Sequence, residues 1–272
     1  MSILVSRRLQ TLLAANRTYY VDASTGSDSN SGLSSGAAFA TIAKAMAVLA
    51  TINANGKTVT VRLADGTYST NVVLPNVVGI AKPGDLILQG NTGDATAVTI
   101  TSSSARTIDA NGINTPWRVQ YLTVTCTNAS YEAIIARGSG TILEVGNVIA
   151  KNGGTNCVAH FSAQAQALLR FVADCSVDGN ANRLLQAADA GMLDGAFRTF
   201  TFLSNATFTL TVDVTGTGYF RARGMTFTLG AFSVTGQRYS VATNGVINTL
   251  GGGASYFPGS TSGATATGGQ YA

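Results

Sequence analysis

The sequence has few charged residues, which occupy 11% of its 272 positions, against about a quarter in an average soluble protein. The 17 basic and 13 acidic side chains are scattered, and no basic run of the kind that grips nucleic acid is present. No apolar stretch of about 18 residues occurs either. We therefore expect no nucleic-acid partner and no insertion into a membrane.

Cysteine and histidine are scarce as well. The three cysteines, Cys126, Cys157 and Cys175, form no CxxC motif and are expected to be buried small residues of a protein made in a reducing cytosol. The single histidine, His160, lies in an apolar run, where packing is its expected role. The run Asp28-Ser29-Asn30 lacks the ligand spacing of a calcium loop, so we expect neither a bound metal nor a cofactor.

Short apolar runs recur at a nearly constant interval. One series, at intervals of 24, 26, 24 and 24 residues, is Ile134, Val158, Leu184, Phe208 and Phe232. A second, at 24, 29, 25 and 25, is Val124, Val148, Val177, Phe202 and Phe227. A third consists of Asn128, Asn152, Asn180 and Asn205. A period of this length indicates stacked units, each of which is closed by its neighbours.

The local pattern indicates that the repeating unit is built from strands. Residues 207–214 alternate strictly between polar and apolar, as a strand with one buried face must. Two or three such strands in 24 or 25 residues leave no room for a helical crossover. The sequence therefore predicts an all-β chain wound as a parallel β-helix. We expect the apolar series to stack in columns and the asparagine amides to bond to one another in a turn ladder.

Four segments are expected along the chain. Residues 1–17 carry a weak amphipathic pattern and are predicted to be an N-terminal anchor helix. Residues 18–56 are predicted to form a strand, a polar loop and, over 38–52, a helix that caps the coil. The parallel β-helix follows over 57–235, with residues 109–116 as a lateral excursion, and a Gly/Ser/Thr-rich trimerisation tail over 236–272.

The two ends of the chain resemble known proteins. Near the N-terminus, Tyr19-Tyr20-Val21-Asp22 and Ala64-Asp65-Gly66-Thr67-Tyr68 resemble right-handed parallel β-helix proteins of the pectate-lyase-like superfamily. Near the C-terminus, Gly251-Gly252-Gly253-Ala254-Ser255-Tyr256-Phe257-Pro258-Gly259 is similar to tail proteins of bacteriophages and prophages. The resemblance implies a trimeric spike or fibre on the virion, made in the bacterial cytoplasm. It would attach through its N-terminus to tail or capsid proteins and meet the host surface with the remainder.

Enzymes of that superfamily cut polysaccharides with clustered carboxylates. The best such cluster here contains Glu144, Asp174 and Asp178, with Arg170 among the arginines near it. Carboxylates on adjacent coils could stand about 5 Å apart, which suits a retaining glycosidase. Alternating Arg and carboxylate is, however, also the ordinary way to pair charges on an outer sheet. The residues predicted to bind a ligand are Trp117, Tyr131, Glu132, Arg198, Arg221 and Arg223.

We expect binding rather than catalysis from this chain. A rigid surface of Thr, Ser and Asn offers many weak hydrogen bonds to host surface polysaccharide, and three copies would multiply them. A homotrimer would also cover neutral outer faces that sparse charge leaves open. Two alternatives stay open: a polysaccharide depolymerase, either glycoside hydrolase or lyase, and a purely structural tail or capsid decoration protein without a ligand.

Overall fold

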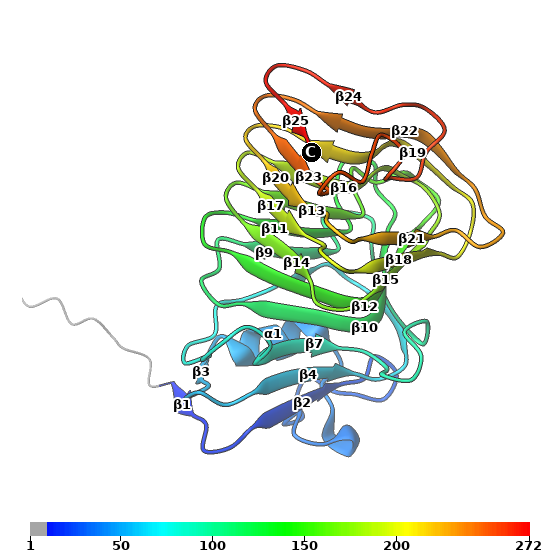
Figure 1. The fold of residues 1–272 in the computed structure, drawn as a ribbon. Helices are drawn as coiled ribbons and strands as arrows, with labels where there is room; N and C mark the ends of the chain where they lie inside the picture. Colours follow the sequence, from blue (N-terminus) through cyan, green and yellow to red (C-terminus); the bar gives the residue numbers. More distant parts are fainter. Residues whose placement is uncertain (1–9) are drawn as a thin grey trace, which may run out of the picture.

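The computed structural model of the protein describes residues 10–272. The chain is a parallel β-solenoid of about eight turns with one short α-helix near its N-terminal end (Figure 1). Every named strand pair is parallel, and most partners lie 24 to 31 positions apart in the sequence, as Gln120 and Gln89 do. The prediction of an all-β parallel β-helix is therefore confirmed.

The strands form three faces of the coil. The first face contains β2 (Arg17–Val21), β4 (Val59–Leu63), β7 (Leu86–Gln89), the first halves of β10 (Trp117–Cys126) and β12 (Ile142–Asn152), β14 (Leu168–Phe171), β17 (Met192–Asp194), β20 (Tyr219–Arg221), β23 (Val246–Asn248) and β25 (Gln270–Tyr271). The second contains β5 (Gly66–Ser69), β8 (Val98–Ser102), the second halves of β10 and β12, β15 (Cys175–Asp178), β18 (Thr199–Phe202) and β21 (Thr226–Thr228). The third contains β6 (Val72–Val73), β9 (Ile108–Asn111), β11 (Ile134–Arg137), β13 (Phe161–Gln164), β16 (Ala181–Ala188), β19 (Ala206–Val214), β22 (Val234–Val241) and β24 (Ala264–Thr265).

The corner between the first and second faces is a sharp bend, which we call the first corner. In β10 and β12 it falls within one strand, at Tyr121 and Asn147, whose φ angles are +57° and +53°. Asparagine tolerates this left-handed backbone better than most residues do, whereas for tyrosine it is uncommon. The Asn147 N–H donates to the carbonyl of Asp174 one coil later, at 2.8 Å. Corner residues of successive coils are therefore held on top of one another.

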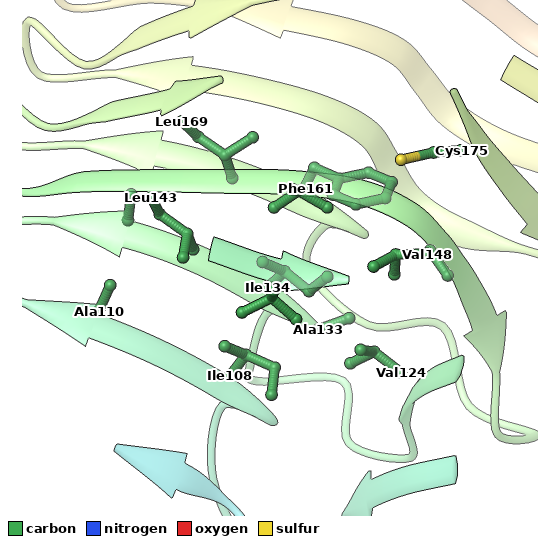
Figure 2. Close-up of a cluster of buried hydrophobic side chains, with 14 of the residues drawn as sticks. Ile108, Ala110, Val124, Ala133, Ile134, Leu143, Val148, Phe161, Leu169 and Cys175 are labelled. Carbon is green, nitrogen blue, oxygen red and sulfur yellow. The ribbon is translucent and has the colours of Figure 1, made fainter. Parts of the chain in front are cut away.

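The core consists of inward-facing apolar columns (Figure 2). On the third face the register pairs Ile108, Ile134, Phe161, Leu185, Val212 and Tyr239, at intervals of 26, 27, 24, 27 and 27 residues. The predicted column through Val158, Leu184 and Phe208 is therefore wrong in register. The coils differ in length, and the 27-residue interval from Ile134 to its partner places Phe161 rather than Val158 over Ile134.

The other two predicted series are correct only in part. Val177 pairs with Phe202 as predicted, but Val124 pairs with Ala150, and Phe227 pairs with Phe200. The asparagine amides of the third series bond to backbone groups of adjacent coils rather than to each other: Asn152 Nδ2 donates to the carbonyl of Asn180, and Asn180 Oδ1 accepts from the N–H of Thr207, both at 2.8 Å.

The N-terminal end of the core is closed by α1 (Ile42–Leu49), which lies within the predicted range and follows the short 3₁₀ turn η1 (Ser35–Ala37). Ile42, Ala45, Met46 and Leu49 form its buried face. Of the predicted anchor helix, residues 1–9 lie outside the described part. Residues 11 and 12 form a strand, β1 (Thr11–Leu12), which pairs with β3 (Ile52–Asn53).

The coil continues past residue 235 into the segment predicted as a tail. Strands β22, β23, β24 and β25 add to the third and first faces there. Phe257 is fully buried at this end of the core, and the rings of Tyr239 and Tyr271 stack with centroids 4.0 Å apart. The predicted excursion over 109–116 is wrong, because Asp109 lies inside β9. Among the described residues, none of the helices is long and apolar enough to span a membrane.

Candidate functional site

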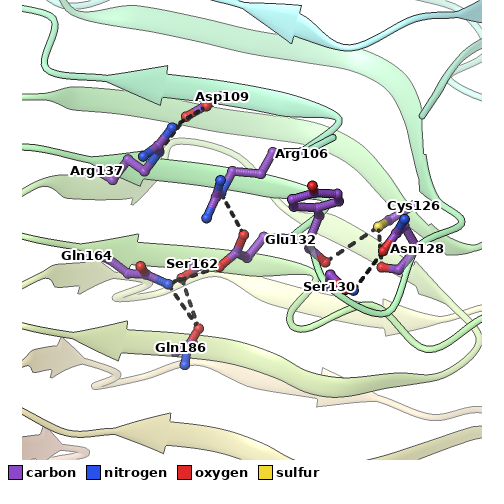
Figure 3. A network of polar contacts seen from close by, with 11 residues as sticks. Arg106, Asp109, Cys126, Asn128, Ser130, Glu132, Arg137, Ser162, Gln164 and Gln186 are labelled. Atoms are coloured by element: carbon purple, nitrogen blue, oxygen red, sulfur yellow. Dashed lines mark hydrogen bonds and ion pairs between the residues drawn. The ribbon is translucent and has the colours of Figure 1, made fainter. Parts of the chain in front are cut away.

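The outer side of the third face carries a closed polar network (Figure 3). Glu132 accepts from Arg106 Nε at 2.8 Å and from Gln164 Nε2 at 3.1 Å. The Arg106 guanidinium lies 5.7 Å from the centroid of the Tyr131 ring, and Arg137 pairs with Asp109 at 2.8 Å. The predicted binding residues Tyr131 and Glu132 are thus engaged within the chain, which indicates a structural role in joining coils.

The outer side of the first face carries a ladder of alternating charge. Its members, one from each of five successive coils, are Arg118, Glu144, Arg170, Asp194 and Arg221. Glu144 Oε2 lies 2.7 Å from Arg118, and its Oε1 lies 3.7 Å from Arg170. Both carboxylate oxygens of Glu144 are therefore held by arginines, and the side chain is only 4% exposed.

The two carboxylates predicted as an acid–base pair lie on different parts of the coil. Glu144 is in the middle of the first face, whereas Asp174 follows β14 at the first corner. Asp174 is exposed, and its Oδ1 accepts from the N–H of Thr199 at 2.8 Å. The third candidate, Asp178, pairs with Lys151 at 2.9 Å. Burial opposes ionisation of Asp178, but the bonds from Lys151 and Ser204 outweigh burial and lower its pKa.

Two further residues singled out in the sequence lie in the core. Trp117 is fully buried, and its Nε1 donates to the carbonyl of Pro75 at 2.8 Å, so its ring is not open to a ligand. His160 is also fully buried, as expected, and its Nε2 lies 3.4 Å from the carbonyl of Gly179. Within residues 10–272, no group of three or more His, Cys, Asp or Glu side chains could hold a metal ion.

A shallow groove of about 300 Å³ runs along the first corner and the outer side of the second face. Its polar lining includes Thr92, Tyr121, Asn147, Asp174, Ser176 and Thr201, which come from five coils. One wall is the loop between β7 and β8. The groove is therefore lined by hydroxyl, amide and carboxylate groups that follow one another from coil to coil.

An exposed aromatic side chain lies at the same corner, in the turn that leads into β18, and Thr201 of that strand lines the groove. The Phe197 side chain is 66% exposed, and the Arg223 guanidinium of the next coil lies 5.2 Å from its ring centroid. Phe197 and Gly224 both have left-handed backbones, with φ of +60° and +64°. A Cβ atom at Gly224 would come within 2.6 Å of Phe197 Cδ1, so glycine leaves the room that the ring occupies beside that coil.

Two arginines at this corner have no carboxylate partner among the described residues. Arg198 donates through Nε to the carbonyl of Phe171 at 3.1 Å, and Arg223 is held by the Phe197 ring. Arg223 Nε is the one buried side-chain polar atom of the described part without a hydrogen-bond partner. The first corner thus combines an exposed ring, two unpaired guanidinium groups and a polar groove, which we call the corner site.

The corner site gathers three of the predicted site residues, Asp174, Arg198 and Arg223. Sequence reasoning missed Phe197, because its side chain is one of several apolar residues at the start of a strand-like run. A signal was present: Phe200 and Phe202 point inward, and the same alternation would bury the charged Arg198. The strand must therefore start after Arg198, which leaves Phe197 in the turn.

No protein-family model, curated protein or solved structure matches the chain. The function must therefore be inferred from the corner site and from the shape of the fold.

Proposed function

We propose that the protein is a bacteriophage virion protein, a homotrimeric tail spike or fibre that binds host cell-surface glycan without cleaving it. The observation that carries the proposal is the exposed Phe197 ring beside a polar groove. The C–H face of a sugar ring stacks on an aromatic ring, while its hydroxyls bond to hydroxyl, amide and carboxylate groups. The corner site presents both kinds of contact side by side.

The fold suits attachment to a host surface. Stacked coils joined by continuous ladders hold Phe197 and the groove in fixed positions, so little conformational entropy is lost when a glycan binds. Three copies in a spike would then raise avidity without any new contact. The similarity of the C-terminal segment to tail proteins of bacteriophages and prophages supports the assignment to a virion, and the N-terminal motif supports the fold.

Binding is favoured over cleavage because the best carboxylates are already engaged. Glu144 is held by two arginines, and Asp174 lies at the corner rather than opposite Glu144 on the ladder. A retaining glycosidase needs two carboxylates that flank one bond at about 5 Å. Neither Glu144 nor Asp174 has that arrangement with the other.

The test is retention of the purified protein by surface polysaccharide from candidate host bacteria. We expect Phe197→Ala to weaken retention about tenfold or more, and Phe232→Ala, which removes another partly exposed ring from a different corner, to leave it unchanged. Retention that is equal in all three proteins would contradict the proposed site. Release of oligosaccharides during the incubation would instead identify a depolymerase.

The assembly is tested separately. Light scattering should give a mass of three times 27.8 kDa. Phage particles that lack the protein should lose adsorption to the host. Normal adsorption by such particles would support a decoration protein without a ligand.

A further inference from the structure

We propose that the sugar unit held at Phe197 carries an anionic group, a carboxylate or a phosphate, which is bound by Arg223 with Arg198 beside it. This inference rests on the proposed glycan-binding function and names the class of glycan. It starts from the distribution of paired and unpaired arginines over the three faces.

Six of the described arginines are neutralised within the chain, whereas Arg17, Arg62 and Arg238 on the flat faces form no ion pair with Asp or Glu there. The six that form ion pairs with Asp or Glu are Arg106, Arg118, Arg137, Arg170, Arg183 and Arg221. Arg198 and Arg223 form none among the described residues, although they lie on adjacent coils at one corner. Positive charge is therefore left unbalanced at the corner site, next to an exposed ring.

The geometry at Arg223 favours a planar anion over a hydroxyl. Its guanidinium lies over the Phe197 ring, a contact that restricts its orientation without pairing its charge with a carboxylate. A guanidinium of fixed orientation binds carboxylate or phosphate through paired N–H donors. A sugar that contacts the edge of the Phe197 ring would bring its ring substituents near this guanidinium, which lies 5.2 Å from the ring centroid.

The other end of the site has the opposite preference. Asp174, in the groove, is an acceptor of hydrogen bonds and repels anions. The sugar hydroxyls are therefore expected at the Asp174 end and the acidic group at the Phe197 end. This polarity would orient a charged glycan along the coil axis.

The experiment compares three polymers with one sugar backbone: dextran, carboxymethyl-dextran and dextran phosphate of equal length. Binding is measured at about 0.15 M salt for the full-length protein, Arg223→Gln and Arg238→Gln. Arg238 lies on the third face and has no ion pair among the described residues, so the two variants lose the same charge. We expect both charged polymers to bind at least tenfold more tightly than dextran. Of the two variants, only Arg223→Gln should lose affinity for the charged polymers, by about tenfold.

The outcomes separate the two proposals. Preference for only one charged polymer would identify the anion as carboxylate or phosphate. Equal losses in Arg223→Gln and Arg238→Gln would mean that the protein attracts polyanions through its net charge, and would overturn the inference. Phe197-dependent retention of host polysaccharide without any preference for the charged dextrans would also overturn it, while leaving the glycan-binding function intact.

Discussion

At the scale of single residues, the position of a side chain on the coil decides what it does. Phe197 and Phe200 are three positions apart, yet the first stands exposed at a corner and the second is fully buried. Phe200 packs edge-on against Phe161 and Phe171, with ring centroids 5.8 and 5.0 Å away. Phe200 therefore contributes to the core, whereas Phe197 is available at the surface.

We expect Phe200→Ala to lower the free energy of unfolding by about 3 to 5 kcal/mol, because it leaves a cavity among three aromatic rings. Phe197→Ala should lower the free energy of unfolding by no more than about 1 kcal/mol, since the side chain is largely exposed and loses contacts with Arg223 and Gly224. Urea unfolding of both variants tests the difference. Equal losses would contradict the assignment of Phe197 to the surface.

His160 is expected to make stability depend on pH. Burial lowers its pKa to about 4, whereas the unfolded chain binds a proton near pH 6.5. The folded state therefore keeps its full stability above about pH 6.5 and loses up to about 3 kcal/mol from this group as the pH falls toward 4. Urea unfolding at pH 7 and pH 4.5 should show a smaller loss for His160→Gln than for the unchanged protein; an identical loss would contradict this.

At the scale of elements, α1 depends on one threonine. Thr41 Oγ1 accepts from the N–H of Lys44 at 3.1 Å and donates to Asp28 Oδ2 at 2.8 Å, so it caps the helix and ties it to the preceding loop. The polar run Asp28-Ser29-Asn30 thus supports the capping helix through hydrogen bonds from Asp28. Asp28 Oδ1 also accepts from the N–H groups of Ala40 and Thr41.

Loss of this cap should weaken the closed end of the coil. We expect Thr41→Ala to lower the free energy of unfolding by about 1 kcal/mol or more, and Thr41→Ser to restore most of it because the hydroxyl is kept. Chemical denaturation of the two variants provides the comparison. A serine variant as unstable as the alanine variant would show that the methyl group, rather than the cap, matters.

The strands and the capping helix could be predicted from the sequence, but their register could not. Apolar alternation has a period of two, so a slip of two residues keeps every side chain on its face. Val148 and Ala150 both point into the core, and nothing in the sequence states which of them lies over Val124. Coil length depends on corner turns, whose lengths vary without changing the apolar pattern.

The candidate site could be predicted only in its charged members. Arg198, Arg223 and Asp174 were recognisable as unusual charges in a chain with few of them. Their meeting at one corner depends on coil lengths, and the exposure of Phe197 depends on a left-handed turn that phenylalanine rarely adopts. Trp117 is a natural binding candidate by residue type. It is buried because it is the first residue of β10 and its side chain points into the core.

At the scale of the whole molecule, each coil contacts mainly the coils next to it. Stability in such a solenoid is a sum of local terms, so damage at one end need not spread to the other. Phe257 closes the C-terminal end of the core, where its ring lies 5.9 Å from Phe220 and 5.8 Å from Phe227. Replacing Phe257 therefore tests whether the two ends of the coil unfold independently.

We expect Phe257→Ala to lower the free energy of unfolding by about 3 kcal/mol. The rate of amide hydrogen exchange should rise in β20 to β25 and change little in β2 to β10. Exchange followed by mass spectrometry on peptides resolves the two ends. A uniform rise along the chain would mean that all coils unfold as one unit.

The bend at Tyr121 and Asn147 has a consequence for how such a molecule can acquire new ligands. A residue on a flat face is tied to two neighbours in the ladder, so replacing it disturbs three coils together. The corner between β7 and β8 is a longer loop than the bends within β10 and β12, which shows that a corner can be extended in place. Loops grafted at the first corner could therefore create a new binding surface, while the columns beneath them stay untouched.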